Sequence, residues 1–169
     1  MVRPETVIES WKTVRQDTVQ TVEEFPASEF GFKPTEDQAS FGEIARHILD
    51  ASHAIVGMLL DGQEDLAGPG FRDLIQRYKP GLPEALEPAA LAAELRSSLE
   101  TQSADLAARD AGFYAKMVTR FDGQQVTRLE LIQFVKEHEL THRQQLFLYS
   151  RLKGIVPPTT RRRAAKAKT

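Results

Sequence analysis

The sequence contains no cysteine among its 169 residues. This absence excludes disulfide bonds, thiolate zinc sites and a cysteine nucleophile. A metal ion bound by this chain must therefore be held by histidine, aspartate or glutamate side chains. Histidine is itself scarce, with four in the chain, so the place of each one in the fold matters.

Long apolar runs are also missing. The N-terminal residues lead directly into a charged segment, and no run has the length of a signal peptide or of a membrane span. We therefore expect a cytoplasmic protein with no membrane partner. Hydrophobic residues still make up 41% of the chain, which is enough for one sizeable core in a single domain.

Charge is unevenly distributed along the chain. Residues 157–169 carry five of the 22 basic residues and no acidic one, which leaves residues 1–156 with 17 basic and 24 acidic residues, a net charge of −7. Such an acidic body argues against nucleic acid as a partner, because a nucleic-acid-binding domain presents a basic face. Residues 157–169 lack large apolar side chains, so we predict a disordered basic tail after a helical domain at 1–156. A weak, salt-sensitive anchor for nucleic acid or an anionic surface is the alternative role for this tail.

The hydrophobic pattern predicts an all-α fold, a four-helix bundle. Apolar residues recur at helical spacing in four segments, which cover approximately residues 4–25, 40–62, 88–110 and 127–153. Glycine and proline are frequent in residues 68–88, and this composition predicts a long crossover. Within it, residues 71–78 have the pattern of a short helix. The sequence has no internal repeat, which indicates one bundle and not a repeat array.

Local signals mark the ends of two of these helices. Ser40 with Glu43, and Thr127 with Glu130, have the spacing of a capping box at a helix start. Between the third and fourth helices, the Asp-Gly pair at 122–123 lies between two short β-prone segments. This pair predicts a small β-hairpin before the last helix.

Two histidines, His138 and His142, are four residues apart in the fourth segment. At 100° per residue, both fall within about 20° of Leu131, at the centre of the stripe that must face the core. Two buried imidazoles side by side are costly unless both are satisfied, and they repel each other when both are protonated. A shared cation resolves both problems, whereas a hydrogen bond to a carbonyl is the alternative for a single core histidine.

A complete metal site needs a third ligand from another helix. In the second segment, His47 lies at the edge of the apolar face, and His53 points away from it. We therefore predict a site for one divalent metal ion formed by His47, His138 and His142, with His53 at the surface or in a secondary interface. Three imidazoles leave a coordination position for water or substrate, which is the form of a catalytic site.

The segment 138–142 also matches the H-E-x-x-H motif of zinc peptidases, with Glu139 in the position of the general base. Peptidases of this type take a third ligand from further along the chain. After His142 the sequence has no histidine, aspartate or glutamate. We therefore interpret the match to a peptidase as fortuitous.

The histidines belong to two longer patterns. These are Ser40-Phe-Gly-Glu-Ile-Ala-Arg-His47-Ile, preceded by Phe32-Lys-Pro, and His138-Glu-Leu-Thr-His142-Arg-Gln-Gln-Leu, followed by Arg151-Leu-Lys-Gly154. Over residues 4–156 the sequence resembles the DinB/YfiT-like metal-binding superfamily. His47 matches the ligand on the second helix, and His138 and His142 match the pair on the fourth. Gln144 departs from the pattern, since similar sequences often have glycine there, and Gln145 falls on the inward face, where its amide could lie near the site.

The resemblance implies an up-down-down-up bundle, zinc or nickel on the three histidines, and a metal-dependent transferase that acts on a small-molecule substrate with a low-molecular-weight thiol. A bound thiol as nucleophile agrees with a chain that has no cysteine. Two alternatives remain open. One is metal-assisted hydrolysis with Glu139 or another carboxylate as base. The other is a non-catalytic, stress-associated bundle whose ion only satisfies the buried histidines.

A homodimer is also implied by the resemblance. Leu49, Val56 and Leu60 are apolar residues of the second helix that lie outside its core stripe, so a partner chain is expected to cover them. The alternative is that the first or third helix of the same chain covers them.

Overall fold

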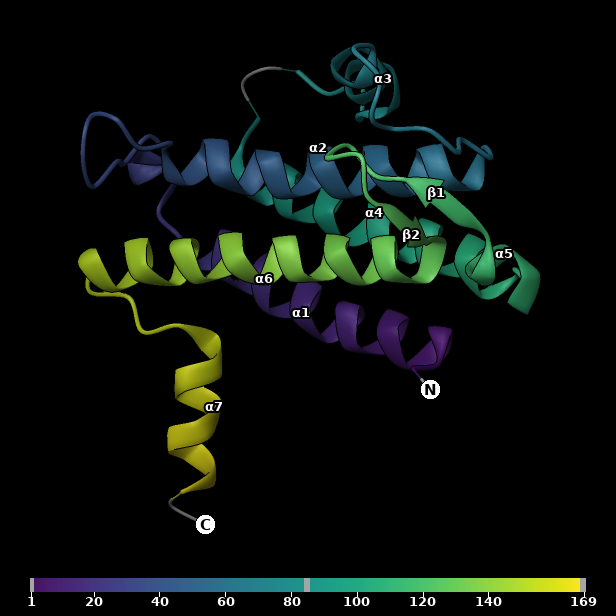
Figure 1. Cartoon of the computed structure of the whole chain (residues 1–169). Helices are drawn as coiled ribbons and strands as arrows, with labels where there is room; N and C mark the ends of the chain where they lie inside the picture. The colour runs from purple at the N-terminus through teal and green to yellow at the C-terminus, as the bar shows by residue number, and fades with distance from the viewer. Residues whose placement is uncertain (1, 84–85, 168–169) are drawn as a thin grey trace.

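Four long helices dominate the computed structural model, which describes residues 2–83 and 86–167 (Figure 1). These helices are α1 (Pro4–Glu24), α2 (Phe41–Leu60), α4 (Pro88–Ala107) and α6 (Arg128–Leu152). Helices α1 and α2 each pack against both α4 and α6, so the four close into a ring around the core. Figure 1 shows α1 and α6 running in one direction and α2 and α4 in the other. The predicted up-down-down-up four-helix bundle is confirmed.

Side-chain caps set the starts of α2 and α6. The Ser40 hydroxyl accepts a hydrogen bond from the backbone N–H of Glu43, whose carboxylate accepts one from the backbone N–H of Ser40. Thr127 and Glu130 make the same reciprocal pair at the start of α6. Both predicted capping boxes are confirmed. They fix where the two helices that bear the histidine candidates begin.

The connection from α2 to α4 contains the short helix α3 (Phe71–Tyr78), which packs against α2. A two-stranded antiparallel hairpin, β1 (Met117–Thr119) and β2 (Gln125–Thr127), precedes α6. Gly123 has a φ of 82° in its turn, a conformation that favours glycine. The predicted crossover helix and hairpin are both present.

Two short helices are absent from the sequence-based prediction. One is the 3-10 turn η1 (Ala27–Glu29) after α1, and the other is α5 (Ala111–Ala115) between α4 and the hairpin. Gly112, just after the predicted third helix at 88–110, is a typical signal for a helix end and not for a new helix. Instead, the Asp110 carboxylate accepts the backbone N–H of Phe113 and caps a new helical turn.

The basic C-terminal segment, expected to be disordered, forms the helix α7 (Pro158–Lys166) in this structure. Helix α7 packs against α1, where Arg161 pairs with Glu24 and Arg162 pairs with Asp17. These contacts are ionic, so a prediction based on apolar composition does not detect them. Residues 168 and 169 of the expected tail lie outside the described residues.

The apolar residues proposed for a dimer contact lie inside the bundle. Leu49 and Val56 are 0% exposed, and Leu60 packs against the same core. Helix α2 is covered by α4, α6 and α3 together, so its buried arc is wider than one apolar stripe. Leu49 and Val56 therefore offer no surface to a partner chain, Leu60 is only partly exposed, and the homodimer remains a prediction from the family resemblance. No helix within the described ranges is both long and apolar enough to cross a membrane.

Candidate metal centre

The three predicted ligands meet between α2 and α6. The Nε2 atom of His138 lies 3.0 Å from Nε2 of His47 and 3.1 Å from Nε2 of His142. One ligand atom from each ring lies within 4.8 Å of the other two. Nitrogen ligands about 2.0–2.1 Å from a tetrahedral zinc ion are about 3.3 Å apart, so the two Nε2 distances from His138 suit a shared ion.

Hydrogen bonds among the rings cannot satisfy all three nitrogens. Each nitrogen of a neutral imidazole either donates one N–H or accepts through one lone pair, yet two other nitrogens face Nε2 of His138. Nδ1 of His142 lies 2.7 Å from Oε1 of Gln145, an acceptor for its N–H, which leaves the Nε2 lone pair turned toward the other rings. Lone pairs that converge in this way repel unless a cation lies among them. The donor set therefore fits a divalent ion.

Burial and neighbouring rings disfavour the protonation of His47 and His138. Partial burial, then the neighbouring His142 and His47, lower the pKa of His138 to about 4. Partial burial and His142 also lower the pKa of His47. His47 and His138 are therefore neutral at physiological pH, which is the form of imidazole that binds a metal ion.

The histidine cluster is closer to the surface than the sequence predicts. His138 and His142 are half-buried, and His47 is exposed. On α6 the buried residues are centred near Glu139, about 80° around the helix from Leu131. Glu139, Arg143 and other polar residues of α6 are buried, and a purely apolar pattern counts them as surface. The histidines consequently lie at one edge of the buried face.

Glu139 faces α1 and not the histidines. Its carboxylate accepts hydrogen bonds from Trp11 Nε1 at 2.6 Å, from Arg15 Nε at 2.8 Å and from Thr18 Oγ1 at 2.8 Å. The side chain is 0% exposed. With both oxygens engaged by donors of α1, Glu139 is not available as a base at the histidine cluster. The H-E-x-x-H match is fortuitous in this fold.

His53 lies outside the cluster, as predicted. Its ring is half-buried between α2 and α4, with Nδ1 2.8 Å from the Ser98 hydroxyl. Its backbone carbonyl accepts a hydrogen bond from the Gln102 side chain. These contacts give His53 a structural place at a helix–helix interface.

Two cavities open beside the histidine cluster, and His47 lines both. The smaller, of about 200 Å³, includes His142 and the polar residues Gln38, Gln145 and Tyr149. The larger, of about 360 Å³, includes His138 and three aromatic residues, Phe71, Phe121 and Phe134. The phenylalanines come from α3, the hairpin and α6, so no local sequence pattern links them to the histidines.

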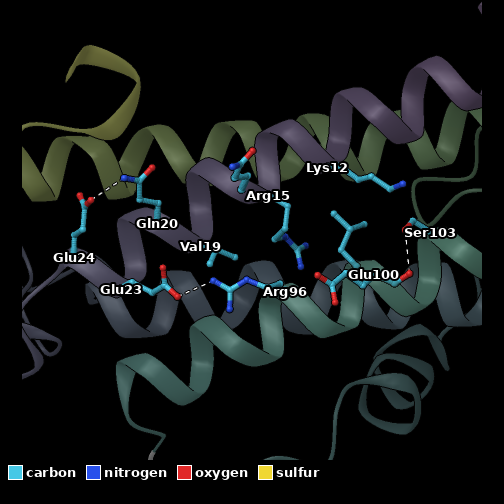
Figure 2. A pocket seen from close by; sticks show the side chains of 11 residues that line it. Lys12, Arg15, Val19, Gln20, Glu23, Glu24, Arg96, Glu100 and Ser103 are labelled. Carbon is cyan, nitrogen blue, oxygen red and sulfur yellow. Dashed lines mark hydrogen bonds and ion pairs between the residues drawn. The ribbon is translucent and has the colours of Figure 1, made fainter. Parts of the chain in front are cut away.

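A wider cleft of about 630 Å³ lies between α1 and α4, as Figure 2 shows, but several of its charged groups are already paired. Arg96 donates to the Glu23 carboxylate at 2.7 Å, and Arg15 on the cleft wall is engaged by Glu139. No histidine is among its lining residues. The cleft is thus large but has, among these lining residues, no cluster of side chains suited to bind a metal ion. The two cavities at the histidine cluster are the better candidates for an active site.

Several solved structures share this fold. YjoA, a DinB-like protein from Bacillus subtilis, is 21% identical with a TM-score of 0.69, over 88% of this chain and 92% of that chain. YfiT from Bacillus subtilis, described as a probable metal-dependent hydrolase with an unusual four-helix bundle topology, is 14% identical with a TM-score of 0.72, over 92% of this chain and 91% of that chain. A mycothiol-dependent maleylpyruvate isomerase is 13% identical with a TM-score of 0.65, over 86% of this chain and 61% of the isomerase. At these identities the likeness concerns the fold.

The sequence as a whole also matches a protein family. No curated protein matches it. The model of the DinB family matches residues 1–168, a range that includes α2 and α6 with the three histidines and extends beyond the expected unit at 1–156 to include α7. By its sequence and by its fold, the chain belongs to the DinB family.

Proposed function

We propose that this chain is a divalent-metal-dependent transferase that joins a low-molecular-weight thiol to a small electrophilic substrate. The observation that carries the proposal is the pair of cavities, of about 200 and 360 Å³, that share His47. A transferase must bring two molecules to one reacting centre. One polar and one aromatic cavity at the same histidines suit two different molecules, whereas hydrolysis needs space only for a substrate and a water.

In this proposal His47, His138 and His142 hold the ion, either zinc or nickel, since both accept imidazole ligands. When bound, the ion lowers the pKa of a coordinated thiol or water. Gln145 accepts the Nδ1–H of His142 and so keeps Nε2 directed at the ion. The fold likeness to a mycothiol-dependent isomerase supports a thiol as the second reactant.

Metal-assisted hydrolysis is the weaker candidate, because the carboxylates considered as bases are already engaged. Glu139 is held by α1. Of the carboxylates that line the two cavities, Glu43 is part of the α2 capping box, and Asp50 pairs with Arg46 at 3.3 Å. A hydrolase would have to release one of them to activate water.

The first test is the metal content of purified protein by elemental analysis. We expect about one equivalent in the wild type and its loss in His47→Ala, His138→Ala and His142→Ala. His53→Ala is the matched control, because it removes a half-buried histidine of α2 that lies outside the cluster. Retention of a full equivalent by all three ligand variants would remove the assignment of the ligands.

The second test is thiol transfer by the metal-loaded protein, with N-acetylcysteine and 1-chloro-2,4-dinitrobenzene as probes. A C–S bond forms, chloride leaves with the electron pair of the C–Cl bond, and the thiol proton passes to solvent. We expect a rate above the protein-free blank for the wild type and His53→Ala, and the blank rate for the three ligand variants. Cleavage of p-nitrophenyl acetate without thiol, together with no thiol transfer, would replace the proposal with hydrolysis.

A further inference from the structure

We propose that the aromatic cavity beside His138 binds molecules that combine a flat apolar group with a carboxylate or a similar anion, and that Lys79 binds the anionic group. The inference rests on the proposed function only in assigning the electrophilic substrate to this cavity. The binding itself depends on side chains outside the histidine cluster: three phenylalanines and one lysine.

The apolar part of the proposal comes from a continuous aromatic wall. The ring centroids of Phe71 and Phe121 are 5.4 Å apart with an interplanar angle of 25°, and those of Phe121 and Phe134 are 5.5 Å apart. Phe134 in turn lies 6.3 Å from the His138 ring. Ile55 and Ile75 line the same cavity. A flat apolar group can contact several rings there in the offset or edge-on arrangements that aromatic groups favour.

The anionic part comes from the charges that line this cavity. They belong to Asp50 and Lys79. Asp50 is neutralised by Arg46, whose Nε lies 3.3 Å from the carboxylate. Lys79, half-buried just after α3, has no hydrogen-bond or ion-pair partner for its ammonium among residues 2–83 and 86–167. The ammonium of a half-buried lysine that has no such partner among the described residues gains from binding an anion beside apolar rings.

A cationic ligand fits this cavity less well. The Arg120 guanidinium lies 5.9 Å from the ring centroid of Phe121 and 5.3 Å from that of Phe134, so a cation already contacts these two rings. A second cation would meet the charge of Lys79 as well. The volume of about 360 Å³ is in the range of small-molecule sites. The shape and the charge together point to a small aromatic acid.

The test uses two unreactive probes of nearly equal shape, 2-naphthylacetate and its neutral analogue 2-naphthylacetamide, titrated calorimetrically. Metal-free protein is used first, because a carboxylate can also bind a metal ion directly. We expect the acid to bind the wild type about tenfold more tightly than the amide, as a charge-assisted contact predicts. The preference should disappear in Lys79→Gln.

Two further variants identify the source of the preference. Lys136→Gln is the matched control, because Lys136 is also half-buried but lines a different cavity with Val2 and Thr6, and it should leave the preference unchanged. Phe134→Leu should weaken both probes by similar factors, because it removes aromatic contact without altering charge. Circular dichroism verifies that each variant is folded. Equal binding of the two probes, a preference that persists in Lys79→Gln, or no binding of either probe would overturn the proposal.

The same measurements separate this inference from the proposed function. If acid-selective binding is found and the metal-loaded protein transfers no thiol, the transferase proposal fails and the assignment of the cavity stands. If thiol is transferred and Lys79→Gln binds both probes as the wild type does, the role of Lys79 fails and the transferase stands.

Discussion

Individual buried polar residues determine how α6 is oriented in the bundle. The Glu139 carboxylate joins α6 to α1 through Trp11, Arg15 and Thr18. Arg15 also donates to the Leu95 carbonyl of α4 and lies 2.9 Å from the Ser52 hydroxyl of α2, so one ion pair is connected to all four long helices. Loss of one partner in such a pair leaves an uncompensated buried charge. The turn of α6 that places the histidines toward α2 therefore depends on Glu139.

We expect Glu139→Gln to lower the free energy of unfolding by about 3 kcal/mol, because Arg15 loses its counter-charge and meets an amide N–H₂ group. Glu137→Gln is the matched control on the exposed face of the same helix and should change the stability by less than about 0.5 kcal/mol. Urea unfolding followed by circular dichroism measures both. Wild-type stability combined with lost activity in Glu139→Gln would instead indicate a catalytic carboxylate.

The lowered pKa of His138 predicts how the stability of the metal-free protein depends on pH. Its pKa is lowered from the ordinary value of 6.5 to about 4 in the folded chain, so between these values the unfolded chain binds more protons. The contribution of His138 to stability is complete above pH 6.5 and is lost as the pH falls toward 4. Urea midpoints across this range should fall less steeply for His138→Gln. Parallel pH profiles for the variant and the wild type would contradict this assignment.

At the scale of elements, the sequence predicts best those features that are set by side chains close in the chain. The capping boxes at Ser40 and Thr127, the crossover helix and the hairpin turn at Gly123 all depend on residues a few positions apart, and all are present. Helix α5 was not predicted because its capping residue, Asp110, lies two positions before Gly112, and a glycine there also signals a helix end.

The sequence predicts which three histidines lie together, but it does not predict how exposed they are. The spacing of His138 and His142 places both on one face of α6, and the edge position of His47 places it toward the same helix pair. Their exposure depends on which polar residues of α6 are buried, and those are satisfied by partners on α1 more than 100 positions away in sequence. Periodicity within one helix contains no information about such partners.

The ion pairs between α7 and α1 allow a prediction at the scale of elements. Arg162 pairs with the buried Asp17, which also accepts from Arg143 at 3.2 Å. We expect Arg162→Ala to lower the unfolding free energy by up to about 1 kcal/mol at low salt and by less at high salt, since the Arg162 side of the pair is exposed and salt screens it. Arg163→Ala is the control, because Arg163 lies on the same helix and makes no hydrogen bond or ion pair with α1 within the described part of the chain. Urea unfolding at two salt concentrations measures the difference, and equal effects of the two variants would contradict the contact.

At the scale of the whole molecule, the ring of four helices explains why the expected dimer contact of α2 is covered and why the cavities could not be predicted. Each long helix packs against two others, so Leu49 and Val56 of α2 are covered within one chain. The smaller cavity at the histidines lies between α2, the segment just before it and α6, and the larger forms where α2, α3, α6 and the hairpin meet. Cavities of this kind depend on contacts between distant segments. They become visible only in the folded chain.

Removal of the metal should lower the stability of the whole bundle. The three histidines belong to α2 and α6, so an ion bound to them links these two helices. An ion that binds only the folded chain adds about 4 kcal/mol of stability when its free concentration is a thousandfold above its Kd. We therefore expect a chelator to lower the melting temperature of the metal-loaded wild type and to leave that of His138→Ala unchanged. Calorimetry of both proteins, with and without chelator, measures this. A stabilising ion without thiol transfer would favour the non-catalytic bundle, because the same three ligands would then act only to hold α2 and α6 together.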